Sequence, residues 1–166
     1  MTTLRSLVLG LAVTFVIAAV AAVSPASAQT AKEVEGTWQL VSVTVAQADK
    51  KTDLFGADPK GQMLLTPDGR FMITITRADL PKYKSGLRAK GSADEYQATV
   101  QGSVAYYGTY TVEGANLVFK VTASTFPNWV GETQQRALKV SGDELSYSTP
   151  PAKSGAVSTL TWKRSK

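Results

Sequence analysis

The chain has 166 residues, which is enough for one domain with a sizeable core. Its 18 Lys and Arg residues exceed its 13 Asp and Glu residues, but the charges are scattered, without the basic face that nucleic-acid binding requires. The chain contains no His and no Cys, which excludes Ser-His-Asp catalysis, cysteine nucleophiles, disulfides and zinc sites built on these residues. We expect no nucleic-acid partner, no metal and no cofactor.

The N-terminal segment has the pattern of an export signal. Arg5 precedes an apolar run from Leu7 to Val23, and Ala26-Ser27-Ala28 supplies a small-x-small cleavage site. An uncleaved anchor is the alternative, but the apolar run is only marginally long enough to span a bilayer. The sequence predicts a signal peptide over residues 1–28 and a mature domain over residues 29–166. The mature protein would be periplasmic or secreted, with no stable membrane anchor.

The mature chain consists of short β-rich runs separated by turn signals. Alternation is clearest at Phe71–Thr76, and the preceding Thr66-Pro67-Asp68-Gly69 predicts a tight hairpin. A polar loop is expected from about Gln47 to Lys60. The eight predicted strands are Gly36–Val45, Met63–Leu65, Phe71–Thr76, Val104–Val112, Leu117–Ala123, Gln134–Val140, Glu144–Ser148 and Val157–Lys163.

One helix is predicted between the third and fourth of these strands. Residues 78–91 form an expected loop, and Ser92 with Glu95 then makes a capping box that begins a short helix over Ala93–Gln101. Eight antiparallel strands joined by short turns favour an all-β, up-and-down barrel, because closure removes exposed strand edges. An open β-sandwich is the main alternative.

Several motifs together resemble one family. They are Gly36-Thr37-Trp38-Gln39-Leu40-Val41-Ser42, Phe55-Gly56-Ala57-Asp58-Pro59-Lys60-Gly61, Thr66-Pro67-Asp68-Gly69-Arg70, Tyr106-Tyr107-Gly108-Thr109-Tyr110 and Phe126-Pro127-Asn128-Trp129-Val130-Gly131. In this order the chain resembles the lipocalin-like domain family of bacteria and fungi, over about residues 35–163. The resemblance implies a calycin-type barrel with a central cavity. It also implies that Trp38 closes the base of the barrel, with Lys163 or Arg164 packed across its ring.

Arg136 is the most informative candidate for ligand binding. Alternation places it on the same strand face as Leu138 and Val140, so an inward-facing core side would also direct the guanidinium inward. A buried cation needs an anionic partner. That partner is either a ligand carboxylate, held bidentately, or an internal acid such as Glu132. In a third alternative, Arg136 lies at the barrel mouth and reaches solvent.

Aromatic residues supply the other candidate ligand contacts. Their rings can serve either as pocket walls or as ordinary core. Gly108 leaves a gap in the side-chain layer, which either admits a ligand or relieves barrel strain. The full set of predicted ligand-binding residues is Arg136, Tyr106, Tyr107, Tyr110, Phe126, Trp129, Tyr96 and Arg77.

Three functions remain open from the sequence. The first is non-catalytic binding of a small amphipathic or acidic molecule in the barrel cavity. The second is an isomerase-like or cyclase-like enzyme, which would need a buried carboxylate beside Tyr or Arg. The third is a structural or interaction domain with a filled barrel. No pair of acids has a recognisable catalytic spacing, so no catalytic residue is assigned; Asp79, close after Arg77, is the acid to inspect. Oligomeric state is not indicated.

Overall fold

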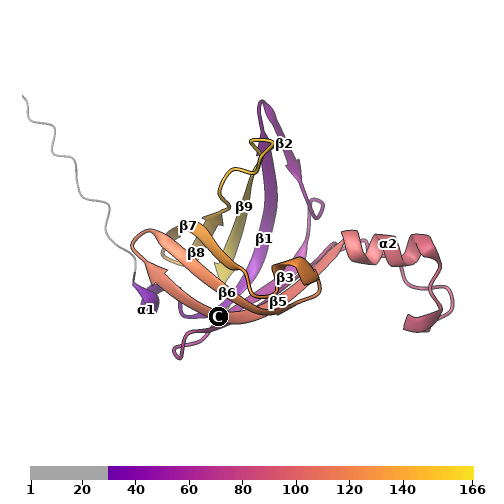
Figure 1. Ribbon diagram of the computed structural model, residues 1–166, viewed down its shortest axis with the longest axis horizontal. Coiled ribbons are helices and arrows are strands. Elements are labelled where there is room, and N and C mark those ends of the chain that lie inside the picture. Colours follow the sequence, from indigo (N-terminus) through magenta and orange to yellow (C-terminus); the bar gives the residue numbers. More distant parts are fainter. Residues whose placement is uncertain (1–29) are drawn as a thin grey trace, which may run out of the picture.

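The computed structural model describes residues 30–166, and the predicted signal peptide therefore lies outside the described residues. The described chain is mostly β-strand, with two α-helices and two 3-10 helices (Figure 1). The elements are α1 (Ala31–Val34), β1 (Gly36–Gln47), β2 (Lys50–Asp53), β3 (Lys60–Leu65), β4 (Arg70–Thr76), η1 (Arg88–Lys90), α2 (Ala93–Gln101), β5 (Ser103–Glu113), β6 (Asn116–Ser124), η2 (Pro127–Trp129), β7 (Thr133–Ser141), β8 (Glu144–Ser148) and β9 (Val157–Arg164).

Eight of the strands form a closed antiparallel barrel. The sheet order runs β1-β3-β4-β5-β6-β7-β8-β9, and β9 pairs back onto β1. The predicted barrel and the helix between its third and fourth strands are both confirmed, and the sandwich alternative is not what forms. Closure satisfies the backbone hydrogen bonds at what would otherwise be two sheet edges.

A ninth strand, β2, lies where a polar loop was expected. β1 is long enough to pair with β9 over residues 38–46 while dividing its other edge between β3 and β2. All four residues of β2 are exposed, so it has no apolar alternation that the sequence could reveal. β2 forms because the edge of β1 beyond its pairing with β3 is free to pair with another segment.

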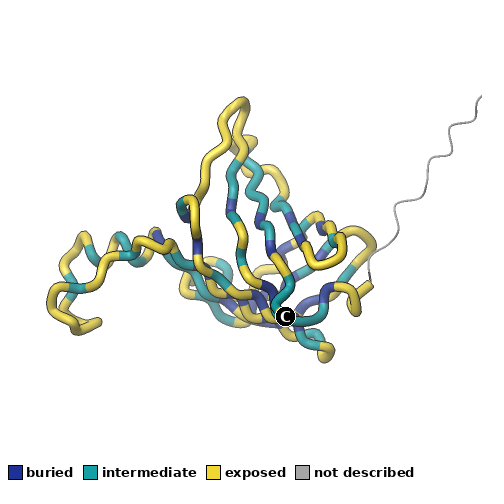
Figure 2. The backbone as a smooth tube through the Cα atoms, turned by 180° about the vertical axis from the view of Figure 1, so that it is seen from behind, coloured by how far each residue is buried: buried dark blue, intermediate teal, exposed yellow. Residues whose placement is uncertain are grey.

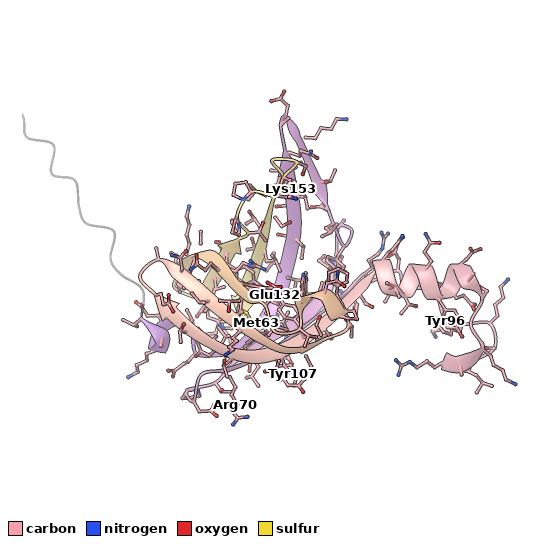
Figure 3. The ribbon with its side chains drawn as sticks, viewed as in Figure 1. Met63, Arg70, Tyr96, Tyr107, Glu132 and Lys153 are labelled. Atoms are coloured by element: carbon pink, nitrogen blue, oxygen red, sulfur yellow. The ribbon has the colours of Figure 1, made fainter. Side chains whose placement is uncertain are left out.

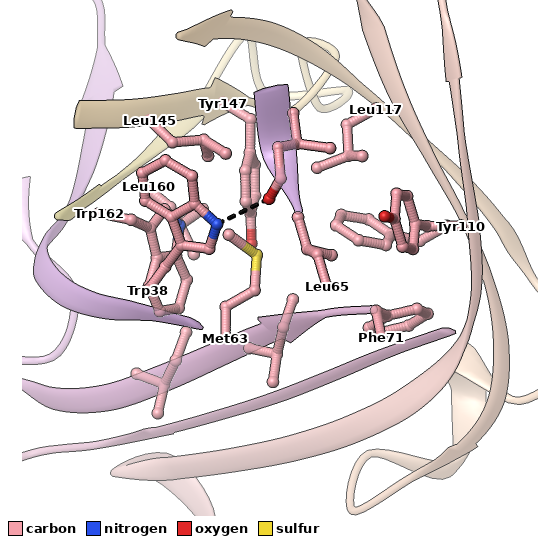
Figure 4. Packing of buried hydrophobic residues seen from close by; sticks show 14 of the residues in the cluster. Trp38, Met63, Leu65, Phe71, Tyr110, Leu117, Leu145, Tyr147, Leu160 and Trp162 are labelled. Atoms are coloured by element: carbon pink, nitrogen blue, oxygen red, sulfur yellow. Dashed lines mark hydrogen bonds between the residues drawn. The ribbon is translucent and has the colours of Figure 1, made fainter. Parts of the chain in front are cut away.

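The barrel is filled by alternate side chains of its strands. In β4, Phe71, Ile73 and Ile75 are buried while the intervening residues are exposed or half-buried. At the end beside α1, the indole N–H of Trp38 donates to the carbonyl of Val34, 2.8 Å away. Figure 4 shows this bond among the packed core side chains.

Residues 77–102, which we call the arm, project from the barrel between β4 and β5. Both views show it extending sideways, and Figure 2 shows that it is largely exposed. At its base, the Arg77 amide donates to the Gly102 carbonyl over 2.8 Å, which brings the two ends of the arm together. Helix α2 begins at the predicted Ser92–Glu95 capping box.

Candidate functional site

The barrel contains a cavity of about 280 Å³ at the end opposite Trp38. Its inner wall is buried, as Ile75 and Tyr147 show, whereas Leu54, Val100 and Phe126 around its mouth are about half exposed or more. The complete lining is Val43, Leu54, Phe55, Ile75, Val100, Gln101, Ser103, Val104, Tyr106, Phe126, Trp129, Arg136, Tyr147, Thr149, Ser158 and Leu160. The cavity is thus mainly apolar, with a few polar groups at defined points, as small-molecule sites are.

Arg136 faces this cavity from β7, as alternation predicted. Its guanidinium donates to the side-chain oxygen of Gln134 over 2.7 Å and to the Gln135 carbonyl over 2.9 Å. The salt bridges among residues 30–166 do not include Arg136, so the predicted alternative of neutralisation by Glu132 does not occur there. Its charge therefore has two neutral acceptors and no anionic one, in a half-buried position where an anion would be stabilised.

Two tyrosines lie beside Arg136. Burial raises the pKa of Tyr106, and the positive charge of Arg136 offsets part of that rise. Burial, followed by the neighbouring Tyr106, raises the pKa of Tyr147 well above its ordinary value. Both hydroxyls therefore stay protonated at neutral pH and retain a proton to donate.

The hydroxyl of Tyr147 and the indole N–H of Trp162 are buried without a hydrogen-bond partner in the described chain. Their rings stack, with centroids 6.3 Å apart, in the core shown in Figure 4. The two hydroxyls of Tyr147 and Tyr106 affect each other's pKa without reaching hydrogen-bond geometry. A buried donor without an acceptor costs free energy, but the Tyr147 hydroxyl has no accessible surface and Trp162 does not line the cavity, so a ligand oxygen reaches the Tyr147 hydroxyl only if the lining moves.

Four of the eight predicted ligand-binding residues line the cavity together: Arg136, Tyr106, Phe126 and Trp129. The ring of Trp129, in η2, packs edge-on against Tyr106 with centroids 5.2 Å apart, and Phe126 packs on the other side of Trp129 at 5.4 Å. Of the two roles that the sequence allowed for aromatic rings, these two loop residues take that of a pocket wall, at the mouth of the cavity.

The other four predicted residues lie elsewhere. Tyr110 is buried outside the cavity lining, where its hydroxyl donates to the Thr66 carbonyl, and Tyr107 is half exposed on the outer wall. Tyr96 lies on the arm and Arg77 at its base, where the Arg77 guanidinium pairs with Asp79. Figure 3 shows Tyr96 far from Met63 in the barrel, and Tyr107 on the outside.

A model of the lipocalin-like domain family matches residues 35–165. The protein belongs to the lipocalin-like domain family. It is also 29% identical, over 102 residues, to the 4'-hydroxy-3'-methoxypropiophenone carrier protein of Aspergillus oryzae. That alignment covers 54% of this chain and 92% of the fungal protein.

The chemistry available in this lipocalin-like cavity is limited by its lining. Among the described residues that line it, none is an Asp or a Glu. Asp79, the acid singled out from the sequence, is held by Arg77 in an exposed pair, and this pairing lowers the pKa of Asp79. Within residues 30–166 no three His, Cys, Asp or Glu side chains gather as a metal site, and no helix is long and apolar enough to cross a membrane. The cavity offers donors and apolar walls, with no carboxylate to serve as a general base.

Sequence reasoning did not single out Tyr147 or the mouth residues Leu54 and Val100. Tyr147 had a usable signal: it alternates with Ser146 and Ser148 in a predicted strand and shares the inward face of Leu145. Leu54 and Val100 had no usable signal in the sequence. Leu54 reaches the cavity from just after β2, and Val100 reaches it from the end of α2.

Proposed function

We propose that this lipocalin-like protein binds a small amphipathic molecule in its barrel cavity and does not transform it. The observation that carries the proposal is the uncompensated guanidinium of Arg136 in an otherwise largely apolar cavity of about 280 Å³. Apolar walls favour a hydrocarbon or aromatic body, and the cation favours an acidic or strongly accepting oxygen. A ligand with both features satisfies the site.

The family and the fungal relative support this proposal. The relative is named as a carrier of 4'-hydroxy-3'-methoxypropiophenone, an aromatic ketone that carries a phenol. A compound of that kind has the apolar ring and the accepting oxygens that the cavity calls for. The enzyme alternative is less well supported because no carboxylate lines the cavity, and a filled barrel is less well supported because the cavity exists. We include export to the periplasm or medium in the proposal, on the sequence pattern of residues 1–28.

Native mass spectrometry of the protein purified from its own host tests the proposal. We expect a mass above that of the polypeptide, released on denaturation as an intact small molecule. In parallel, the neutral dye N-phenyl-1-naphthylamine should bind with enhanced fluorescence, and 4'-hydroxy-3'-methoxypropiophenone should displace it.

A blocked cavity provides the control. Val104 lies in the cavity wall, whereas Val118 lies on the outer face of β6, between inward-facing neighbours. Val104→Trp should abolish dye binding, and Val118→Trp should leave it unchanged. Equal binding by the two variants would place the dye outside the barrel and contradict the proposal, as would recovery of a chemically altered ligand after incubation.

A further inference from the structure

The tip of the arm carries a concentration of positive charge. Residues 82–90, which we call the basic tip, contain four cations and no acidic residue: Lys82, Lys84, Arg88 and Lys90. None of these four takes part in a salt bridge within the part of the chain that the structure describes. Leu87 lies among them with 54% of its surface exposed. The basic tip therefore combines a concentration of positive charge with an exposed apolar side chain.

The basic tip is held in shape by the helix behind it. The Tyr83 hydroxyl lies 3.1 Å from the Thr99 hydroxyl, and the Tyr83 ring packs edge-on against Tyr96 with centroids 5.6 Å apart. The Lys84 amide donates to the Glu95 carboxylate over 2.8 Å. The cations are thus presented on an ordered support, which lowers the entropic cost of binding through them.

The acidic residues of the arm cancel only part of this charge. Asp79 is paired with Arg77 at the arm's base, and Glu95 accepts from the backbone amides of Lys84 and Ser92. Asp94 is exposed in the first turn of α2, four residues after Lys90, and forms no salt bridge among the described residues. Lys82 and Arg88 flank a shallow hollow lined also by Tyr83, Gly86 and Thr99, a setting that suits a phosphate group.

The basic tip lies at the outer end of the arm, and the inner end of the arm forms part of the cavity mouth (Figure 1). Val100 and Gln101, the last residues of α2, line the cavity, and the arm extends outward from them (Figure 1). Leu54, Val100 and Phe126 give the mouth a half-exposed apolar rim. Four cations with the exposed Leu87 among them are the combination that binds an anionic bilayer surface. A nucleic-acid site would need a longer basic face, and an acidic protein partner would not need the exposed Leu87.

We propose that the basic tip docks the protein on membranes rich in anionic phospholipid, with lipid phosphates at Lys82 and Arg88 and Leu87 inserted among the headgroups. Docking there holds the barrel at the membrane surface through the arm. If the proposed cavity function holds, docking brings the protein to the bilayer in which amphipathic ligands dissolve. The docking itself does not depend on that function.

Co-sedimentation with phosphatidylcholine vesicles, with and without phosphatidylglycerol, tests the docking. The probe variant replaces the basic tip cations: Lys82→Gln, Lys84→Gln, Arg88→Gln and Lys90→Gln. The matched control removes the same charge from exposed positions on α1 and the outer barrel wall: Lys32→Gln, Lys120→Gln, Lys139→Gln and Lys163→Gln.

The wild type should bind only the anionic vesicles, and raised salt should weaken the binding. Because each cation near an anionic surface contributes about fivefold, the tip variant should bind roughly 100-fold more weakly or worse, and the control should bind much more tightly than the tip variant. Leu87→Ser should weaken binding without changing its salt dependence.

Three results would overturn the docking proposal: no vesicle binding by the wild type, equal losses in the tip and control variants, or binding to soluble polyglutamate with none to vesicles. The last would indicate an acidic protein partner instead. N-phenyl-1-naphthylamine titration of every variant in solution keeps the two proposals separate. If the tip variant still binds the dye but no longer binds vesicles, the loss is assigned to the tip alone. If the wild type does not bind the dye, the cavity function is contradicted, and the docking result is unaffected.

Discussion

The guanidinium of Arg164 lies over the indole ring of Trp38, with its central carbon 4.1 Å from the ring centre. Its two terminal nitrogens also donate to the carbonyls of Glu35 and Glu33, over 2.6 and 2.7 Å. The last strand thereby fastens α1 and the first strand across the closed end of the barrel. Of the two residues that the sequence proposed for this position, Arg164 occupies it, and the side chain of the neighbouring Lys163 is exposed.

Arg164→Ala should lower the free energy of unfolding by about 2–3 kcal/mol, because it removes the cation–π contact and two charged hydrogen bonds to backbone carbonyls. Arg164→Lys should recover only part of this loss, since an ammonium cannot reach both carbonyls with a planar fork. Lys163→Ala, at the exposed neighbour, should change stability by no more than about 0.5 kcal/mol. Urea denaturation followed by tryptophan fluorescence measures all three, and equal midpoints for the alanine variants would contradict the fastening role.

Gly108 lies where the register between β5 and β6 shifts, because β6 has one additional residue, Thr122, opposite β5. A β-carbon at this position would clash with the Lys120 carbonyl oxygen. The gap that the sequence suggested for a ligand is therefore filled by the backbone of β6. Gly108→Ala should destabilise the barrel by roughly 3 kcal/mol or more, because backbone on both strands must move. Thr109→Ala, at the exposed next residue, serves as the control; a Gly108→Ala protein with wild-type stability in urea would show that the bulge is not so tightly packed.

Alternation along the strands made the inward direction of Arg136 and Tyr106 predictable, because side chains of a strand point to opposite faces. It could not say how far along the barrel each residue lies. Tyr110 shares the inward face of Tyr106 yet is buried outside the cavity lining. The projection of the arm could not be predicted, for a different reason. Tyr83 and Tyr96 pack on each other at a distance from the barrel, and no periodic pattern reports whether a helix folds back or projects.

The packing of the arm should depend on pH through Glu95. Hydrogen bonds from the amides of Lys84 and Ser92 lower the pKa of Glu95 below its ordinary value. A lowered pKa stabilises the folded arm at pH values above the ordinary glutamate pKa, and this contribution is lost as the pH falls through the lowered value. The protection factor of the Lys84 amide, which is the exchange rate of an unstructured amide at the same pH divided by that of the Lys84 amide, should therefore fall when the pH drops from about 7 to about 3.

Glu95→Gln should remove this pH dependence, because a neutral amide side chain does not titrate. Asp94→Asn, one residue earlier in the same helical turn, should keep it, since Glu95 remains in place. A Lys84 amide that exchanges with the same pH profile in the wild type and in Glu95→Gln would show that the carboxylate does not hold the loop.

Arg136 should discriminate between ligands by charge. Arg136→Met keeps much of the side chain's length and removes its cation. The anionic dye 8-anilino-1-naphthalenesulfonate should bind this variant roughly tenfold more weakly or worse, because a charge-assisted contact is lost. The neutral N-phenyl-1-naphthylamine should bind within about twofold of the wild type, because the apolar walls are unchanged. Lys139→Met, on the outward face of the same strand, should affect neither dye. An equal loss of affinity for the two dyes would mean that Arg136 shapes the cavity and does not distinguish ligands by their charge.

The Tyr147 hydroxyl provides the sharpest test of whether the inner end of the cavity awaits a ligand. In the ligand-free protein this buried donor has no partner within the described chain. Tyr147→Phe should therefore leave the free energy of unfolding unchanged or raise it by up to about 1 kcal/mol, because it removes an uncompensated polar group. Tyr110→Phe is the matched control: its hydroxyl donates to the Thr66 carbonyl over 3.0 Å, so its loss should cost about 1 kcal/mol.

Urea denaturation of protein from which any co-purified ligand has been removed distinguishes the two variants. If the lining moves to let an oxygen of the co-purified ligand accept from Tyr147, adding that ligand should reverse their order, since this hydrogen bond stabilises the wild type and not Tyr147→Phe. Equal destabilisation by the two substitutions without ligand would show that the Tyr147 hydroxyl already has a partner, such as a buried water. In that case the inner end of the cavity would be satisfied when empty, and Arg136 alone would remain to orient the ligand.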